Sequence, residues 1–272
     1  MSQYLKHRGL WLMMPMWLTS CATVQTTEQG AIGVDRKQYM IVSEEAVEKS
    51  AATAYEQALD GATKKGELNV DVAQTARVKI IAQRLIPHTG VFRPDAVNWT
   101  WQINVQATPD VNAYCMPGGK IMVYSGLIEK LNATDAELAA VIGHEIAHAL
   151  REHTRERVSR MYAQQVGLSV LAVLSGASDA AVELAGQVST VTFTLPHSRE
   201  QEAEADRMGL ELMARAGYDP ASAVSLWQKM DKLASNKTPA FLGTHPASAD
   251  REKQLQRNIP KVFSLYEAAP KP

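Results

Sequence analysis

The chain has 272 residues, of which 46% are apolar and 21% charged, and its formal net charge is −1. A chain of this size and composition can bury a full hydrophobic core, which excludes a protein that is disordered throughout. The absence of an excess of positive charge argues against a nucleic-acid partner. Removal of a leader that carries Lys6 and Arg8 would make the chain more acidic still.

The first 20 residues are organised like a secretory signal, with a basic start and an apolar stretch at 10–18 that is too short to span a membrane. The motif Leu18-Thr19-Ser20-Cys21 resembles a bacterial lipobox, so we predict that Cys21 is lipidated. Because Ala22 is not the aspartate that retains many lipoproteins in the inner membrane, the outer membrane is favoured. The alternative is an ordinary signal peptide that contains a cysteine. Lipidation of Cys21 would leave Cys115 without a disulfide partner in this chain.

Residues 21–34 are rich in Thr, Gln and Gly, and we expect them to form a tether between the lipid and a single domain at 35–265. Two helices are expected at about 43–60 and 70–86 from their apolar periodicity. The last residues, 266–272, are expected to fray.

Apolar and polar residues alternate at 97–106, which is typical of a half-buried strand. Residues 112–124 predict a hairpin around Pro117-Gly118-Gly119. We expect a small sheet with one edge open, where an extended peptide could pair with Asn112 and Ala113 through main-chain hydrogen bonds. The alternative is an ordinary core hairpin, because strand composition does not distinguish the two.

Residues 134–150 predict a helix with a metal-binding motif. Thr134 and Glu137 form a capping box at its start. His144 and His148 are four residues apart, or about 40° around the helix, so both imidazoles can reach one metal ion. Glu145 projects beside the metal, where it can take a proton from a water molecule. This spacing is typical of a zinc hydrolase.

A zinc ion with one open position needs a third protein ligand. His153 lies nine residues after His144, about 180° around a continuous helix, so we expect it to point away. Glu202 and Asp206 share one face of a second helical stretch, where Glu202 can complete a His, His, Glu set and Asp206 can hydrogen-bond a ligand histidine. The alternative is a solvated acidic helix face.

Residues 166–186 contain an apolar run that Ser175, Gly176 and Asp179 interrupt, so it is too short for a transmembrane helix. We expect a helical hairpin over the site, and its role as a lid or as a membrane contact stays open. A last helix is expected from Ser248 to about Asn258, with Arg251 in its first turn.

Four sequence blocks in this order resemble the CAAX prenyl protease and HtpX-like zinc metallopeptidases, in particular the periplasmic BepA/LoiP-type lipoprotein branch. The blocks are Val111-Asn112-Ala113-Tyr114 with residues 117–127, then residues 141–148, residues 198–206, and Thr244-His245-Pro246 with Arg251. The ordered set is more specific than any one motif. The resemblance implies a mostly helical α+β fold, namely a zincin-like (gluzincin) domain whose small sheet packs on the helix of the His-Glu-x-x-His motif.

The resemblance also implies roles for individual residues. Three residues are implied to bind one zinc ion per chain: His144, His148 and Glu202. Glu145 is implied to be the general base, and Asp206 a catalytic partner of the ligands or a proton donor. Arg199 and Arg251 are expected beside the ligands. His245 is implied to occupy the open position and to hold the enzyme inactive, although a lone histidine before a proline is more often an ordinary loop residue.

The sequence therefore predicts a zinc-dependent endopeptidase on the periplasmic side of the bacterial outer membrane. From the resemblance, its substrates are expected to be misfolded or mis-assembled envelope proteins, and the outer-membrane assembly machinery is a candidate partner. The alternative is a periplasmic chaperone or assembly factor for outer-membrane proteins whose zinc site is regulatory.

Overall fold

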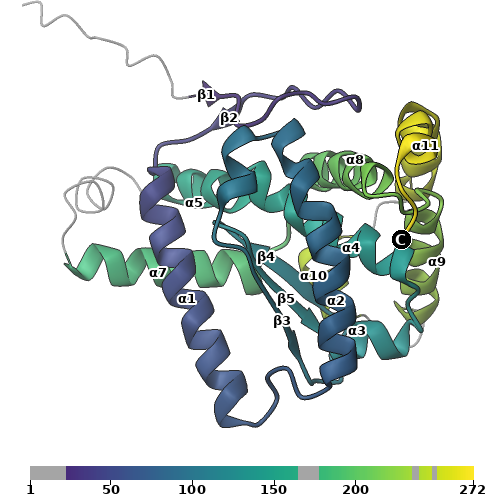
Figure 1. Ribbon diagram of the computed structural model, residues 1–272. Coiled ribbons are helices and arrows are strands. Elements are labelled where there is room, and N and C mark those ends of the chain that lie inside the picture. Colours follow the sequence, from purple (N-terminus) through teal and green to yellow (C-terminus); the bar gives the residue numbers. More distant parts are fainter. Residues whose placement is uncertain (1–22, 165–177, 235–238, 247–249) are drawn as a thin grey trace, which may run out of the picture.

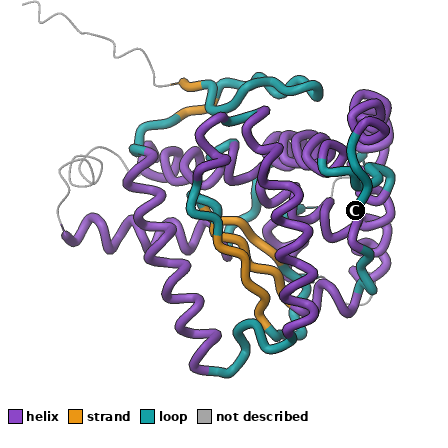
Figure 2. The backbone as a smooth tube through the Cα atoms, viewed as in Figure 1, coloured by secondary structure: helices purple, strands orange, loops and turns teal. Residues whose placement is uncertain are grey.

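The computed structural model describes residues 23–164, 178–234, 239–246 and 250–272. Helices predominate in these ranges and surround a small sheet, which confirms the expected α+β class (Figure 2). The helices in the first half of the chain are α1 (Glu44–Lys64), α2 (Val72–Leu85), α3 (Ser125–Lys130), α4 (Asp135–Leu150) and α5 (His153–Gln164). Those in the second half are α7 (Ser178–Phe193), α8 (Arg199–Arg215), α9 (Ser222–Ala234), α10 (Ala240–Thr244) and α11 (Arg251–Ala268).

The three-stranded sheet runs between α1 and α2 in the view of Figure 1. Its order is β3-β5-β4, from strands β3 (Gln102–Gln106), β4 (Ala113–Met116) and β5 (Lys120–Tyr124). β3 is parallel to β5, whereas β4 is antiparallel to β5 and lies at an edge. Gly118 and Gly119 make the turn between β4 and β5 with φ of 75° and 79°, a region that glycine adopts without strain. The predicted hairpin is therefore confirmed.

The strand predicted at 97–106 is shorter than expected, because its first part is helical. Residues Pro94–Asn98 form the 3-10 helix η2, which follows another, η1 (Ile86–Val91). Pro94 fixes φ at a helical value, and the amide of Trp99 donates to the carbonyl of Ala96. This local turn outweighs the alternating pattern until β3 begins at Gln102.

Helix α4 is buried along nearly its whole length. The predicted capping box is present, since Thr134 Oγ1 accepts from the amide of Glu137 and the Glu137 carboxylate accepts from the amide of Thr134. Every residue from Glu137 to Leu150 is buried. The helix packs against β4, α2, α8 and α9, so its side chains are held from several directions.

Helices α4 and α8 cross at a pair of glycines. A Cβ atom added to Gly209 would lie 2.8 Å from the amide nitrogen of His144. One added to Gly143 would lie 3.1 Å from the carbonyl oxygen of Gly209. A side chain at either position would push the two helices apart, because packed interiors leave no room for extra atoms. The glycines therefore allow α8 to approach the histidine face of α4.

Residues 23–42 pack on the folded domain. Strands β1 (Thr23–Val24) and β2 (Gln38–Tyr39) pair antiparallel, and the apolar side chains of Ile32 and Val34 are buried. The amide of Ile32 also donates to the carboxylate of Glu211 in α8. Most of the segment expected to be a tether thus lies against the domain, because it contributes its own apolar residues to the core.

The expected hairpin at 166–186 lies partly outside the described residues, which resume with α7. This helix packs against α1 and α5, with Leu184, Val188 and Val191 in a second apolar cluster. Within the described ranges, no helix is both long and apolar enough to cross a membrane. At the C-terminus, α11 continues to Ala268 and the carbonyl of Pro270 accepts a hydrogen bond from Arg84, so the end expected to fray is partly held.

Gly209→Ala is expected to separate α4 from α8. Because the new Cβ meets backbone atoms at His144, we expect the free energy of unfolding in urea to fall by about 1–3 kcal/mol. Gly61→Ala in α1 is the matched control, because no atom lies within 4 Å of its added Cβ. The free energy of unfolding of this control should be unchanged or rise by up to about 1 kcal/mol. Equal stability of Gly209→Ala and the wild type would contradict the tight crossing.

Candidate metal centre

His144 and His148 of α4 and Glu202 of α8 face one point. The Nε2 atoms of the two histidines are 3.0 Å apart. Glu202 places Oε1 3.3 Å from Nε2 of His148 and Oε2 3.5 Å from Nε2 of His144. Ligands about 2.0–2.1 Å from a tetrahedral zinc ion lie roughly 3.3 Å from one another. The spacing of the three residues therefore fits zinc.

His245 joins this group from the end of α10. Its Nδ1 lies 3.2 Å from Nε2 of His144 and 3.1 Å from Oε1 of Glu202. The ring stacks on Phe241 with 4.3 Å between centroids, and the amide of His245 donates to the carbonyl of Phe241. The candidate ligand atoms of the four residues all lie within 4.8 Å of one another. His245 is thus held where a fourth ligand would be.

Glu145 is buried beside the four residues. Its Oε1 accepts no hydrogen bond from the described residues, and Nε2 of His245 lies 3.5 Å away. Burial raises the pKa of this carboxyl group, because its charged form loses solvation. A carboxylate with a raised pKa and a free oxygen is suited to take up a proton at the centre.

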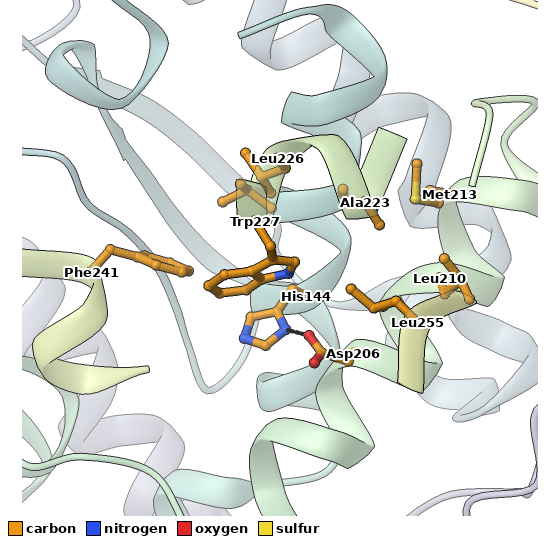
Figure 3. A pocket seen from close by; sticks show the side chains of 11 residues that line it. His144, Asp206, Leu210, Met213, Ala223, Leu226, Trp227, Phe241 and Leu255 are labelled. Atoms are coloured by element: carbon orange, nitrogen blue, oxygen red, sulfur yellow. Dashed lines mark ion pairs between the residues drawn. The ribbon is translucent and has the colours of Figure 1, made fainter. Parts of the chain in front are cut away.

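Asp206 and Arg251 hold the ligands from behind. Asp206 Oδ1 lies 3.0 Å from Nδ1 of His144 (Figure 3). The other ring nitrogen of His144, Nε2, faces His148 and Glu202. Arg251 reaches Asp206 at 2.6 Å and Glu202 at 3.0 Å, and its guanidinium carbon lies 3.4 Å above the ring of Trp227. These contacts limit the rotation of both His144 and Glu202.

The charges around the ligands favour a bound cation. Glu145, Glu202 and Asp206 supply three carboxylates, against which stand two guanidinium groups, that of Arg251 on two of them and that of Arg157 beside His197. Burial disfavours a charged His144, but the carboxylates of Asp206 and Glu202 outweigh it and raise the pKa of His144 to about 9. The donor set, its spacing and its excess of negative charge together fit a divalent metal ion.

Strand β4 borders a cavity that opens on this centre. The cavity is lined by Asn112 and Ala113, by Glu145, and by residues from α7 and the loop before α8. The two residues predicted to contact a peptide thus line the same cavity as the candidate base, at the edge strand β4. The Asn112 carbonyl already accepts from the amide of Tyr124 in β5.

Comparison with known proteins agrees with this geometry. Residues 72–259, more than half of the chain, match peptidase family M48. The chain belongs to family M48. The resemblance seen in the sequence is confirmed at this level, and the matched residues include His144, Glu145, His148, Glu202 and Asp206.

Named relatives of this M48 chain are metallopeptidases. It is 37% identical over 161 residues to the mitochondrial metalloendopeptidase OMA1 of Arabidopsis thaliana, covering 59% of this chain and 32% of the relative. The OMA1 protein of Schizosaccharomyces pombe is 34% identical over 194 residues, which cover 69% of this chain and 54% of the relative. Metalloprotease LoiP of Escherichia coli is 33% identical over 159 residues, which cover 56% of this chain and 60% of the relative. The chain thus matches between about a third and three fifths of these relatives.

The prediction that His153 points away on a continuous helix is wrong in its geometry. Helix α4 ends at Leu150, and Glu152 turns the backbone with φ of 50°. His153 therefore begins α5 and folds back to His148, where the two Nδ1 atoms are 2.8 Å apart. His153 meets the far edge of the His148 ring and is not among the four residues around the centre.

His197 is a residue of this site that sequence reasoning missed. Its ring lies 4.0 Å from that of His148 and 5.0 Å from that of His245. His197 immediately precedes Ser198, the N-cap of α8. Its place directly before the helix that carries Glu202 is the one feature of the sequence that could have indicated it. Arg199, by contrast, is exposed at the start of α8, and none of the hydrogen bonds or ion pairs seen among the described residues joins it to the centre.

Proposed function

We propose that this M48 chain is a zinc-dependent endopeptidase whose zinc ion is held by His144, His148 and Glu202. The observation that carries the proposal is the convergence of these ligand atoms at zinc spacing beside the carboxylate of Glu145, whose Oε1 accepts no hydrogen bond from the described residues. When bound, zinc would lower the pKa of a water molecule and polarise a peptide carbonyl. Two imidazoles and one carboxylate are a ligand set typical of catalytic sites that keep one position open.

The side chains of this chain then have distinct tasks. Glu145 takes the proton from the attacking water and can pass it to the leaving amine. Asp206 and Arg251 keep His144 and Glu202 in position, which reduces reorganisation during the reaction. The open edge of β4 at Ala113 aligns an extended peptide over the base, and the side chain of Asn112 lines the same cavity. Because main-chain hydrogen bonds would supply this contact, we expect little dependence on substrate sequence.

Glu145→Gln is expected to bind one zinc ion per chain and to lose at least about 100-fold of its casein-degrading activity, because the proton acceptor is gone. Metal analysis and a casein assay measure the two effects. Asp135→Asn, an exposed acidic residue at the start of the same helix, is the matched control and should keep full activity. A zinc-loaded Glu145→Gln protein that cleaves casein at the wild-type rate would refute the mechanism and favour the chaperone alternative.

His245 is proposed to restrain the enzyme by occupying the fourth position around the zinc ion. Its support is the distance of 3.1–3.2 Å from Nδ1 to two ligands, together with the stacking on Phe241 that fixes the ring. A substrate carbonyl and His245 would compete for the same place. Cleavage then requires that the end of α10 move.

His245→Ala is therefore expected to raise the rate of casein cleavage about 3-fold or more, with one zinc ion still bound. This factor corresponds to about 0.7 kcal/mol that the substrate no longer spends on displacing His245. His88→Ala, at a histidine in η1 away from the centre, is the control and should match the wild type. Cleavage by zinc-loaded His245→Ala at or below the wild-type rate would exclude this restraint.

We further propose a place in the bacterial envelope, within the BepA/LoiP-type branch of the family. The support is the lipobox at Cys21, which precedes the described residues, and the 33% identity to LoiP. Misfolded or mis-assembled envelope proteins are the proposed substrates, and the outer-membrane assembly machinery is a proposed partner.

The anchor can be tested by labelling with radioactive palmitate in a Gram-negative host. The wild type should incorporate label and fractionate with the outer membrane, whereas Cys21→Ala should do neither. Cys115→Ala is the matched control, since it removes the buried cysteine of β4 and should leave labelling unchanged. Labelling of Cys21→Ala at the wild-type level would contradict the proposed anchor.

A further inference from the structure

A hydrogen-bond relay leads from His148 to a buried carboxylate. Nδ1 of His148 lies 2.8 Å from Nδ1 of His153, and Nε2 of His153 lies 3.0 Å from Oε2 of Glu204. All three residues are buried, with His153 fully inaccessible and Glu204 1% exposed. We call these three residues the His148 relay. It connects the candidate ligand on α4 to the start of α5 and to α8.

Two arginines make Glu204 an obligatory acceptor. Its Oε1 accepts from Nε of Arg36 and from a terminal nitrogen of Arg151, each at 3.0 Å. Its Oε2 accepts from a second nitrogen of Arg36 at 2.9 Å. A guanidinium group offers only donors. Glu204 is therefore held as a carboxylate, and the proton in its bond with His153 must lie on the imidazole.

The position of that proton determines the next one. When Nε2 of His153 carries hydrogen, Nδ1 of the same neutral ring is an acceptor. The proton in the bond between the two histidines must then belong to Nδ1 of His148. Nε2 of His148, which points at Glu202 and His144, is left with its lone pair free. A metal ion needs this tautomer.

We propose that Glu204 and His153 are positioning residues that fix the tautomer of His148 and so keep its Nε2 free to bind zinc. The inference rests on the proposed metal centre and extends it. His144 is held by a carboxylate directly, through Asp206, whereas His148 is held by a carboxylate through a second imidazole. A carboxylate that orients a ligand histidine strengthens metal binding.

The relay also ties the metal centre to the N-terminal part of the chain. Arg36 bridges Glu204 and Glu156, and Gln38 of β2 donates to the carbonyl of Arg151 at 2.6 Å. Residues from the segment 23–42 thus close the network around Glu204. The tautomer of a ligand on α4 depends on side chains that lie more than 100 residues earlier in the sequence.

The test measures zinc dissociation constants by competition with a chelating dye, on the full chain. In Glu204→Gln the two arginines claim the amide oxygen, so the amide N–H group faces His153 and favours the opposite tautomer. We expect zinc affinity to fall about 10-fold or more. His153→Leu should lower zinc affinity to a similar extent. His153→Asn should restore affinity, because the amide oxygen of the new side chain takes the place of the ring Nδ1 and accepts from His148.

The double variant separates positioning from general structural damage. In the His153→Asn background the new amide oxygen accepts the proton of His148 without help from Glu204. Adding Glu204→Gln in this background should lower zinc affinity less than about 2-fold. The difference from the loss of about 10-fold in Glu204→Gln alone would show that the two residues are strongly coupled. Glu211→Gln is the matched control, since it neutralises another buried glutamate of α8 that also binds the N-terminal segment. It should leave zinc affinity unchanged.

The other outcomes would refute either the His148 relay or the proposed metal centre. An unchanged affinity in Glu204→Gln, or an equal loss in the His153→Asn background, would refute the relay while leaving the metal centre in place. Failure of His153→Asn to restore affinity, with an unchanged circular dichroism spectrum, would also refute it. A wild type that binds zinc no better than His144→Ala would refute the proposed metal centre itself.

Discussion

The close approach of α4 and α8 is the constraint on which the rest of the structure depends. Two imidazoles come from one helix and the third ligand from the other, and their atoms must meet at about 3.3 Å to serve one zinc ion. Gly143 and Gly209 make this distance possible by letting backbone meet backbone. The capping boxes at Thr134 and Ser198 then fix where each helix starts, and so which residues reach the crossing.

Charge is the second requirement, because the crossing is buried. Glu145, Glu202, Asp206 and Glu204 are all carboxyl groups at or next to the core of the domain. Isolated charges in such a place are costly, so each needs a cation or hydrogen-bond donors. Arg251 of α11 pairs with Glu202, whereas Arg36 of the N-terminal segment and Arg151 pair with Glu204 on the other side. The terminal segments of the chain are therefore part of the electrostatic design of its centre.

Much of this site could be predicted from sequence because its signals are local. The spacing of His144 and His148, the capping box at Thr134, and the pair Glu202 and Asp206 each lie within one helix, where periodicity sets direction. His153 and His197 could not be placed in this way, since the direction of each depends on how one element turns into the next. Glu152, with its positive φ, redirects His153 in a single residue.

The same limit applies to the N-terminal segment and to the first sheet strand. The composition of residues 21–34 indicates flexibility, but Ile32 and Val34 find buried places that only the folded domain provides. The alternation at 97–106 gives way to a turn that begins at Pro94. Local propensity was outweighed in the first case by tertiary burial and in the second by a neighbouring proline.

The packing of the N-terminal segment has a consequence for the reach of the enzyme. Thr26 already bonds Arg151, and it follows Cys21 by five residues, which span at most about 18 Å when extended. If Cys21 carries lipid, the folded domain begins within this distance of the membrane. The enzyme would then be held close to the lipid in a restricted orientation, and only proteins that approach this surface would reach its active site.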